Sequence, residues 1–288
     1  MSPRNLLSFL LLLPQRGQRK RRTYGRRLSR IREDVTDPGR SFDIGALLAE
    51  LDAIEKVMSP GDVKTWGEMN FIRGVIHLRL GKLDEALAYS KIAASMSFDQ
   101  PFLSSDEHSF LFSNLASRAE SAKRWQLAAE AYTSLIAFFD TNSPCPEARR
   151  LQASESLAIC LRNAGQREEA LRTMDETVRR AERALAPDIA EMLLLLARSG
   201  QFAFDLDDFE AVRRYQERRR ALATQHDQAA HLDDSLYRLA VVSMCTGMPQ
   251  EADDLMVLRV CLAQESHDDS RIATAKRDLL MSRHLGLS

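Results

Sequence analysis

Apolar residues recur every three or four positions through most of the chain, which is the spacing of amphipathic helices and not of strands. From residue 62 onward, glycine or short polar clusters interrupt this spacing at regular intervals. The pattern therefore predicts five pairs of helices, each pair joined by a short turn. We expect the first helices at about 62–80, 106–122, 146–164, 188–202 and 231–246, and the second helices at about 83–97, 125–140, 167–184, 206–224 and 249–264.

Two markers of small residues show that the pairs are copies of one unit. The first marker opens the second helices and recurs about every 41 or 42 residues, at Ala86, Ala128, Ala170, Ala211 or Val212, and Ala252. The second lies in the first helices, at Gly74 and at the Leu-Ala pairs that begin at residues 115, 157, 196 and 239. Chance small residues would not keep two markers in phase, so the chain contains an internal repeat.

Glycine and proline mark the ends of the predicted helices. The turns inside the pairs fall at Gly81, Lys123, Gly165, near Asp207, and Gly247, and glycine suits the left-handed conformation that such turns require. Prolines that cannot continue a helix lie between the pairs, at Pro60, Pro101, Pro144 or Pro146, and Pro187. The segments 104–107 and 187–191 have the residues of helix starts.

The recurring alanines predict where neighbouring helices cross closely. Helices approach each other most tightly where the side chains between them are small. We therefore expect buried crossings at Ala86, Ala93, Ala128, Ala158, Ala170 and Ala252.

This arrangement of small residues, turn glycines and following large residues resembles the tetratricopeptide repeat (TPR) family. The best matches begin at Gly74, Leu115 and Leu157, and the period of about 42 residues is similar to that of the kinesin-light-chain-like subclass. The resemblance implies an all-α, right-handed α-solenoid of about five antiparallel helix pairs. It forms one repeat domain over 41–288, with repeats at about 62–100, 104–142, 146–185, 188–225 and 231–265 and cap helices at 43–58 and 268–285.

Charge separates the N-terminus from the rest of the chain. Residues 1–32 contain ten Arg or Lys and no Asp or Glu, whereas the net charge of the whole chain is −1. We predict that residues 1–40 form a basic, disordered tail, in which residues 16–32 offer a surface for nucleic acid or an anionic membrane. The eight apolar residues 6–13 are too few to span a bilayer, which needs roughly 20.

The sequence holds no motif for catalysis, metal or a cofactor. It has no phosphate-binding glycine loop, nucleophile elbow or HExxH sequence. Cys145, Cys160, Cys245 and Cys261 form no CxxC pair, so we expect reduced thiols and neither a disulfide framework nor a zinc site. We expect a protein that is not an enzyme, has no cofactor and works in the cytoplasm, with the nucleus or an organelle matrix as alternatives because of the Arg-rich N-terminus.

The resemblance also implies a concave groove lined by the first helices. The positions along each first helix that the resemblance assigns to this groove mark fifteen candidate partner-binding residues: Phe71, Val75, Arg79, Phe110, Ser113, Asn114, Ser117, Glu155, Ile159, Arg162, Leu194, Arg198, Tyr237, Val241 and Met244. Of these, Asn114, Arg162 and Arg198 are the types that clamp a peptide carboxylate. Phe71, Phe110, Ile159 and Tyr237 suit apolar anchors, or else pack against a neighbouring helix.

We therefore expect a non-catalytic adaptor or regulator that binds a segment of a protein or peptide partner in its groove. Two alternatives stay open at this point. One is a sensory or accessory subunit that binds a small ligand or a signalling peptide. The other is a recruiter that docks on nucleic acid or an anionic membrane through its basic N-terminal residues.

Overall fold

The computed structural model describes residues 24–37, 39–59, 61–99, 102–141, 146–183 and 188–285, which are helical apart from short connections and contain no strand. The predicted all-α class is confirmed. The chain divides into two compact units after Ala164. The sequence instead predicts one domain over 41–288. In a repeat array each repeat contacts only its neighbouring repeats, so a division based on contacts can fall at any point along the array.

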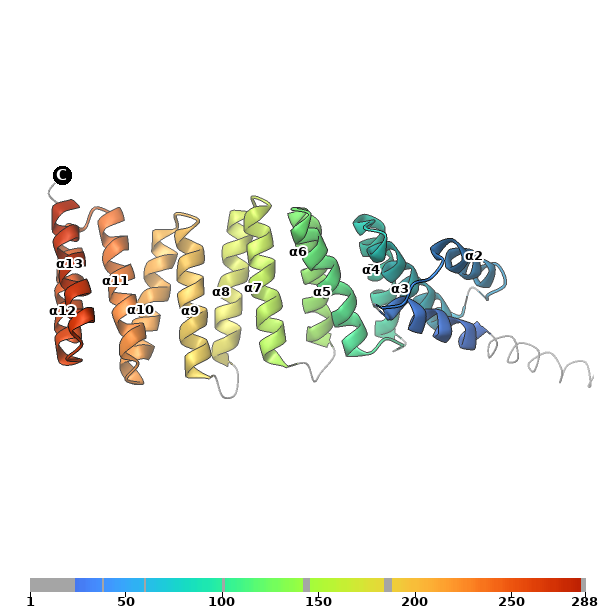
Figure 1. Cartoon of the computed structure of the whole chain (residues 1–288), viewed down its shortest axis with the longest axis horizontal. Coiled ribbons are helices and arrows are strands. Elements are labelled where there is room, and N and C mark those ends of the chain that lie inside the picture. The colour runs from blue at the N-terminus through green and yellow to red at the C-terminus, as the bar shows by residue number, and fades with distance from the viewer. Residues whose placement is uncertain are drawn as a thin grey trace, which may run out of the picture. The chain divides into compact units, whose positions relative to one another are not determined.

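The first unit holds a helix at residues 24–36 and six further helices (Figure 1). These are α2 (Ile44–Glu55), α3 (Val63–Arg79), α4 (Leu83–Asp99), α5 (Ser105–Ser121), α6 (Trp125–Thr141) and α7 (Glu147–Asn163). α3 packs on α4, and α6 packs on both α5 and α7. The predicted pairs 62–97 and 106–140 and the cap at 43–58 are therefore present in this unit.

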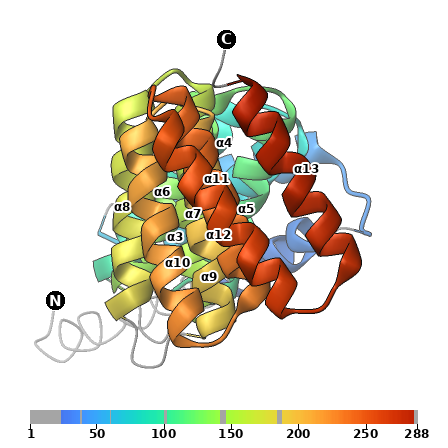
Figure 2. The same cartoon turned by 90° about the vertical axis from the view of Figure 1, so that its left-hand side faces the viewer.

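The second unit holds α8 (Arg167–Arg183), α9 (Ile189–Phe204), α10 (Phe209–Gln225), α11 (Ala229–Cys245), α12 (Pro249–Glu265) and α13 (Asp269–Leu285). α9 to α13 pack in sequence, each on the next. Figure 2 shows α13 beside α12 at the C-terminal end, as expected of the cap predicted at 268–285. Its Leu280 and Met281 are exposed.

Residues with positive φ end the first helix of every pair. The turn positions expected from the sequence have φ of 73° at Gly81, 56° at Lys123, 84° at Gly165, 57° at Asp207 and 74° at Gly247. After the first of these, the amide of Lys82 donates to the carbonyl of His77 over 3.0 Å, the bond that closes a helix through a left-handed residue.

The connections between pairs change along the chain. α3, α5, α7 and α9 begin at 63, 105, 147 and 189, which keeps the period predicted from the sequence. α11 and α13 begin at 229 and 269, and each lies slightly closer to the preceding first helix than that period would place it. The links after α10 and α12 contain positive-φ residues of their own, Asp227 and His267. The sequence placed these two connections between predicted helices, but it did not indicate their positive φ, because neither connection contains glycine.

The predicted helix starts are also present. Ser104 caps α5, and it forms a capping box with Glu107. The Asp188 carboxylate accepts hydrogen bonds from the amides of Ala190 and Glu191 at the start of α9. These bonds satisfy amides that have no partner within the helix.

The small residues that the sequence predicts at close helix crossings are buried. The six alanines expected at crossings all have 0% exposure, and they are Ala86, Ala93, Ala128, Ala158, Ala170 and Ala252. A Cβ atom added at Gly74 of α3 would lie 2.9 Å from the Ser90 hydroxyl oxygen of α4. At Gly74, α3 and α4 therefore approach so closely that a larger side chain would have to displace Ser90.

Replacing Ala128 or Ala170 by leucine is expected to lower the free energy of unfolding by about 1–3 kcal/mol, because the added carbons overfill a closed crossing. Urea denaturation measures the change. Ala137→Leu is the matched control for Ala128→Leu, because Ala137 is exposed on the same helix, α6. Equal stability of the Ala128→Leu and Ala137→Leu variants would contradict the packing assignment.

Candidate partner-binding surface

The repeat places the candidate residues of unit 1 in equivalent rows. Phe71, Ser113 and Glu155 each lie eight residues after the start of α3, α5 or α7, so they occupy the same level of successive first helices. The same spacing relates Val75, Ser117 and Ile159. The structure can therefore be compared repeat by repeat.

In the first repeat the prediction of a free surface is wrong. Phe71 and Val75 are 0% and 1% exposed, because helix 24–36 lies across α3 (Figure 1). The Arg32 guanidinium carbon is 5.3 Å from the centre of the Phe71 ring. This part of the predicted groove is filled by the chain itself.

Arg79 also binds the N-terminal segment. Its guanidinium donates to the carbonyl oxygens of Arg40, over 3.2 Å, and of Asp37, and it lies 4.9 Å from the centre of the Phe42 ring. The described residues of the N-terminal segment, 24–37 and 39–42, therefore contact α3 both at Phe71 and at Arg79.

The prediction of a disordered tail over 1–40 is wrong for residues 24–36. Leu28, Ile31 and Val35 are at most 1% exposed, and their spacing of three and four residues is that of a helix face. This spacing was the available signal, but the high positive charge of the segment masked it. Residues 1–23 lie outside the described residues.

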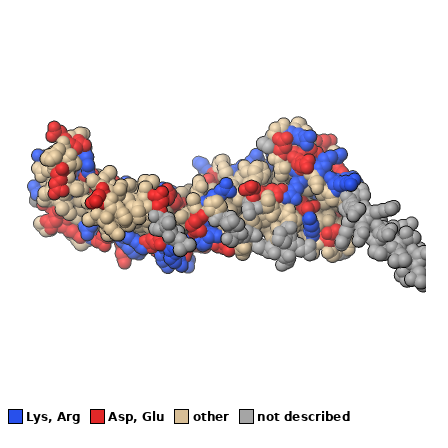
Figure 3. Space-filling model, turned by 90° about the horizontal axis from the view of Figure 1, so that it is seen from below, with Lys and Arg blue, Asp and Glu red and all other residues tan. Residues whose placement is uncertain are grey.

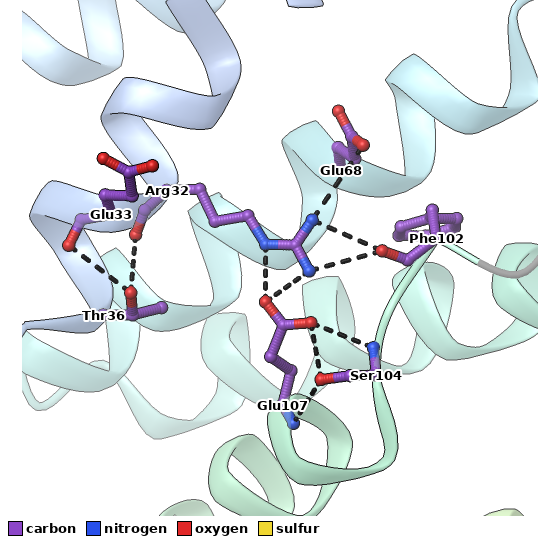
Figure 4. A network of polar contacts seen from close by, with 7 residues as sticks. All are labelled: Arg32, Glu33, Thr36, Glu68, Phe102, Ser104 and Glu107. Carbon is purple, nitrogen blue, oxygen red and sulfur yellow. Dashed lines mark hydrogen bonds and ion pairs between the residues drawn. The ribbon is translucent and has the colours of Figure 1, made fainter.

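A polar network around Arg32 joins helix 24–36 to two repeats (Figure 4). The Arg32 Nε donates to Glu107 Oε1 of α5 over 2.6 Å, and a second guanidinium nitrogen lies 3.9 Å from Glu68 of α3. Both terminal nitrogens donate to the carbonyl oxygen of Phe102 over 3.3 Å. One side chain thus connects the N-terminal helix with α3, α5 and the segment between the repeats.

The two carboxylates of this network are perturbed in opposite directions. Burial raises the pKa of Glu68, although Lys64 and Arg32 oppose this. Burial also acts to raise the pKa of Glu107, but the hydrogen bonds from Arg32 and Ser104 outweigh it and lower that pKa. Glu107 is therefore the carboxylate that most strongly favours the charged network.

The second and third repeats leave their first helices open. Phe110 and Ile159 are 39% and 41% exposed. Ser113, Asn114 and Ser117 are exposed as well, and the Asn114 amide donates to the Phe110 carbonyl over 2.7 Å. Glu155 and Arg162 on α7 are half-buried.

A pocket of about 400 Å³ lies between α5 and α7, with α6 as its floor. We call it the α5–α7 pocket. Its lining residues are Ser109, Phe110, Ser113, Tyr132, Leu135, Phe139, Arg149, Gln152, Ala153 and Ser156. Two of these, Phe110 and Ser113, were expected from the sequence. The resemblance did not mark the others, because they lie on the second helix α6 or at positions of α5 and α7 that differ from those it marks.

The α5–α7 pocket offers a neutral hydroxyl, on Tyr132, and a guanidinium, on Arg149, as groups that can bind a ligand. Burial raises the pKa of Tyr132 to about 12, so its hydroxyl stays protonated near neutral pH. Arg149 has a side chain that is 59% exposed, and it lies 3.8 Å from Asp106, which is 93% exposed. A surface pair of this kind contributes little, so the guanidinium can exchange it for another anion.

Unit 2 exposes a different mixture of candidates. Leu194 is 45% exposed, and Arg198 is exposed with its guanidinium 3.4 Å from Glu191. Tyr237 is 38% exposed, and the Arg259 guanidinium lies 5.0 Å from the centre of its ring. Met244 instead packs against the buried cluster of Ala240, Ala252 and Met256 and is half-buried.

A smaller pocket in unit 2, of about 130 Å³, lies between α9 and α11 on α10. Its lining residues are Gly200, Gln201, Phe204, Val212, Tyr237, Arg238 and Val241. It includes two expected residues, Tyr237 and Val241. A Cβ atom added at Gly200 would lie 2.2 Å from the Gln216 amide nitrogen, so glycine permits this close approach of α9 to α10.

The one buried cysteine among the described residues, Cys160, is not a reactive thiol. Burial raises the pKa of the Cys160 thiol to about 12, and its sulfur lies 3.4 Å from Glu120 Oε1. Such a thiol is a poor nucleophile. Cys245 and Cys261 are free and exposed, whereas Cys145 lies outside the described residues.

The described part of the chain has neither a candidate metal site nor a candidate membrane-spanning helix. No group of three or more His, Cys, Asp or Glu side chains is placed to hold a metal ion there. No helix among these residues has the length and apolar character needed to cross a bilayer. On the face seen in Figure 3, acidic and basic side chains are interspersed in each unit.

The fold and surface define an all-α protein built from repeated pairs of helices. No protein-family model and no curated protein matches the sequence. The chain is similar to solved TPR-like structures, but their TM-scores are below 0.5, so its class rests on its own helix pairs. One of these structures is a kinesin light chain with nearly identical TPR-like repeats from Podosopora anserina, which is 15% identical over 73% of this chain and 99% of that chain, with a TM-score of 0.47. Another is BtubC (BKLC) from P. vanneervenii, which is 16% identical over 85% of this chain and 92% of that chain, with a TM-score of 0.45. A third is the apo form of the quorum sensor NprR from B. thuringiensis, which is 22% identical over 84% of this chain and 65% of that chain, with a TM-score of 0.39.

Proposed function

We propose that the protein is a non-catalytic adaptor or regulator that binds a segment of a protein partner along its first helices. The observation that carries this proposal is the α5–α7 pocket, which is open and lined by apolar and uncharged polar groups with a single guanidinium. Pockets of a few hundred Å³ with this mixture are typical of binding sites. Phe110 and Ile159 add exposed apolar area on the two helices that border it.

The N-terminal segment supports the proposal from within the chain. Helix 24–36 lies on the α3 face, at the level that Ser113 and Ser117 occupy on α5. The first helices of this unit can therefore hold a helical segment through apolar contacts and a charged anchor. A partner would use the neighbouring faces in the same way.

The alternative of recruitment through residues 16–32 has less support from the described part of that segment. Arg27 is 2.7 Å from Glu50 Oε1, and Arg32 is bound by Glu107, so both guanidinium groups serve internal contacts. Residues 16–23 lie outside the described residues. A small ligand or signalling peptide in the α5–α7 pocket remains the second candidate, because a pocket of 400 Å³ can also hold such a molecule.

Affinity capture from a cell extract tests the proposal with a matched pair of surfaces. Proteins captured by the full chain should be lost when Phe110 and Ile159 are both changed to alanine. Ile92→Ala is the control, because Ile92 has the same 41% exposure as Ile159 but lies on a second helix, α4. If the double variant captures the same proteins as the unchanged chain, binding does not use this face.

A further inference from the structure

Small uncharged residues form the exposed side of α2, which is uncommon for a helix at a protein surface. These residues are Gly45, Ala46, Ala49 and Ala53. The three charged residues of α2 bind cations of neighbouring helices instead. Glu50 lies 2.7 Å from Arg27, and Arg73 of α3 lies 2.7 Å from Asp52 and 2.5 Å from Glu55. Because the solvent side of a helix normally carries charged residues, this side of α2 is suited to close contact with another helix.

α13 presents large apolar side chains to solvent. Leu280 and Met281 are 64% and 57% exposed, the highest values among the exposed large apolar residues of the described chain. Lys276 and Arg277 lie one turn before them on the same side and are exposed as well. α13 packs on α12. The side of α13 that holds these four residues is therefore open.

The exposed sides of α2 and α13 are complementary when the two helices run antiparallel, as adjacent helices of an array do. The reference point of this alignment is Leu280 opposite Ala49. The equal rise per residue of the two helices then brings Arg277 level with Asp52. Asp52 can accept this second guanidinium, because it keeps 59% exposure beside Arg73. Large side chains thus meet small ones, and a cation meets a carboxylate.

The charges of the two helices select this pairing over pairing of like helices. α2 contains three Asp or Glu and no basic residue, whereas α13 contains four Lys or Arg and two Asp. Like charges across a contact disfavour it, and opposite charges orient the two surfaces. Two α13 helices would bring their basic residues together, and two α2 helices would bring their carboxylates together.

We propose that α13 of one copy of the protein docks on the exposed side of α2 of a second copy. Leu280 and Met281 pack against the small residues of α2, which let the two helices approach closely. Arg277 pairs with Asp52 at the edge of the contact. The two surfaces differ, so the contact is heterologous and can repeat from one copy to the next.

This contact involves none of the residues of the α5–α7 pocket. Assembly would therefore join several copies of the partner-binding surface. Linked binding sites raise the apparent affinity for a partner that carries several segments, without any new contact to that partner. Self-association and partner binding use different residues, so either can fail without the other.

Sedimentation velocity of the full chain over about 1–100 μM, a range that covers weak to moderate self-association, tests the contact. The average mass should rise with concentration and pass beyond that of a dimer. Leu280→Glu should weaken the association about tenfold or more, because it removes an apolar anchor and adds a carboxylate to a face that meets Asp52. Leu258→Glu is the control, because Leu258 is 51% exposed on α12, outside the contact.

A mixture of two variants separates this contact from pairing of like surfaces. Ala49→Gln with Ala53→Gln blocks α2, and Leu280→Glu blocks α13, so each variant alone should be a monomer. An equimolar mixture should form dimers and nothing larger, because one unaltered α13 then meets one unaltered α2. Ala137→Gln with Ala221→Gln, at exposed alanines of α6 and α10, should assemble like the unchanged chain. Circular dichroism confirms that all variants retain their helices.

Three results would overturn the inference. The first is an unchanged chain that stays monomeric at every concentration. The second is a mixture of the two variants that stays monomeric. The third is an association that Leu280→Glu removes but the α2 variant leaves intact, because α13 would then pair with itself.

Discussion

Replacement of Arg32 by alanine is expected to lower the free energy of unfolding of unit 1 by about 2–3 kcal/mol and to loosen helix 24–36 from α3. The variant leaves Glu68 and Glu107 partly buried without their shared cation and leaves the Phe102 carbonyl without its donors. It also uncovers the Phe71 ring. The loss should therefore be larger than for an ordinary surface ion pair.

Urea denaturation followed by tryptophan fluorescence measures this effect, because both tryptophans, Trp66 and Trp125, lie in unit 1. Hydrogen exchange should show that residues 24–36 lose protection before the rest of the unit. Arg26→Ala is the control, since Arg26 is exposed on the same helix. Unchanged exchange in the Arg32→Ala variant would show that the network does not hold the helix.

Lowering the pH from 7 to 5 is expected to destabilise unit 1 by about 2 kcal/mol through His108 alone, and the loss should approach about 3 kcal/mol below pH 4. His108 is 1% exposed, and its ring is stacked 3.9 Å from that of Phe138. Burial lowers its pKa from 6.5 to about 4, although the Ser104 carbonyl and the Glu107 carboxylate oppose the shift.

The sign follows from which state binds the proton first. The unfolded chain protonates His108 near pH 6.5, whereas the folded chain resists protonation down to about pH 4. The stability associated with the neutral ring is thus present above pH 6.5 and is lost as the pH falls from 6.5 to 4.

His108→Phe separates this effect from other acid effects. The variant keeps an aromatic ring against Phe138 but cannot take up a proton in this range. Urea denaturation at pH 7 and pH 5 should therefore show a smaller acid loss in the variant than in the unchanged chain. Equal losses in both proteins would remove His108 as the cause.

The sequence predicted the helical repeats well, because their signals are local. Gly81, Gly165 and Gly247 mark turns that need positive φ, and the buried alanines mark crossings that need small side chains. Asp227 and His267 adopt the same backbone conformation without glycine, so the residue types at these turns did not predict their positive φ. The sequence also predicted only in part that the spacing between first helices becomes shorter after α9.

The binding surface was harder to predict, because exposure depends on segments far apart in the chain. Phe71 has an apolar side chain at a groove position, which fits a partner site as well as an internal contact. Only the position of helix 24–36 in the structure shows that Phe71 makes an internal contact. The kinesin-light-chain-like subclass and the right-handed sense of the solenoid stay predictions.

The α5–α7 pocket was also predicted only in part from the sequence. Offsets along the first helices identify Phe110 and Ser113, but the floor comes from Leu135 and Phe139 on α6. These two side chains have the spacing of core residues in any amphipathic helix. Their role at an opening appears only when α5 and α7 are seen to leave a gap above them.

The even spacing of helix starts in the second unit makes its smallest building block a single helix with its turn. From α9 to α13 the helices begin at 189, 209, 229, 249 and 269, so the interval between successive starts is constant whether or not the two helices belong to one pair. Gain or loss of one such block there would keep every remaining turn intact. It would, however, move the final helix from the row of first helices to the row of second helices, or the reverse. Duplication of an odd number of helices would therefore end the array with a different kind of helix from duplication of an even number.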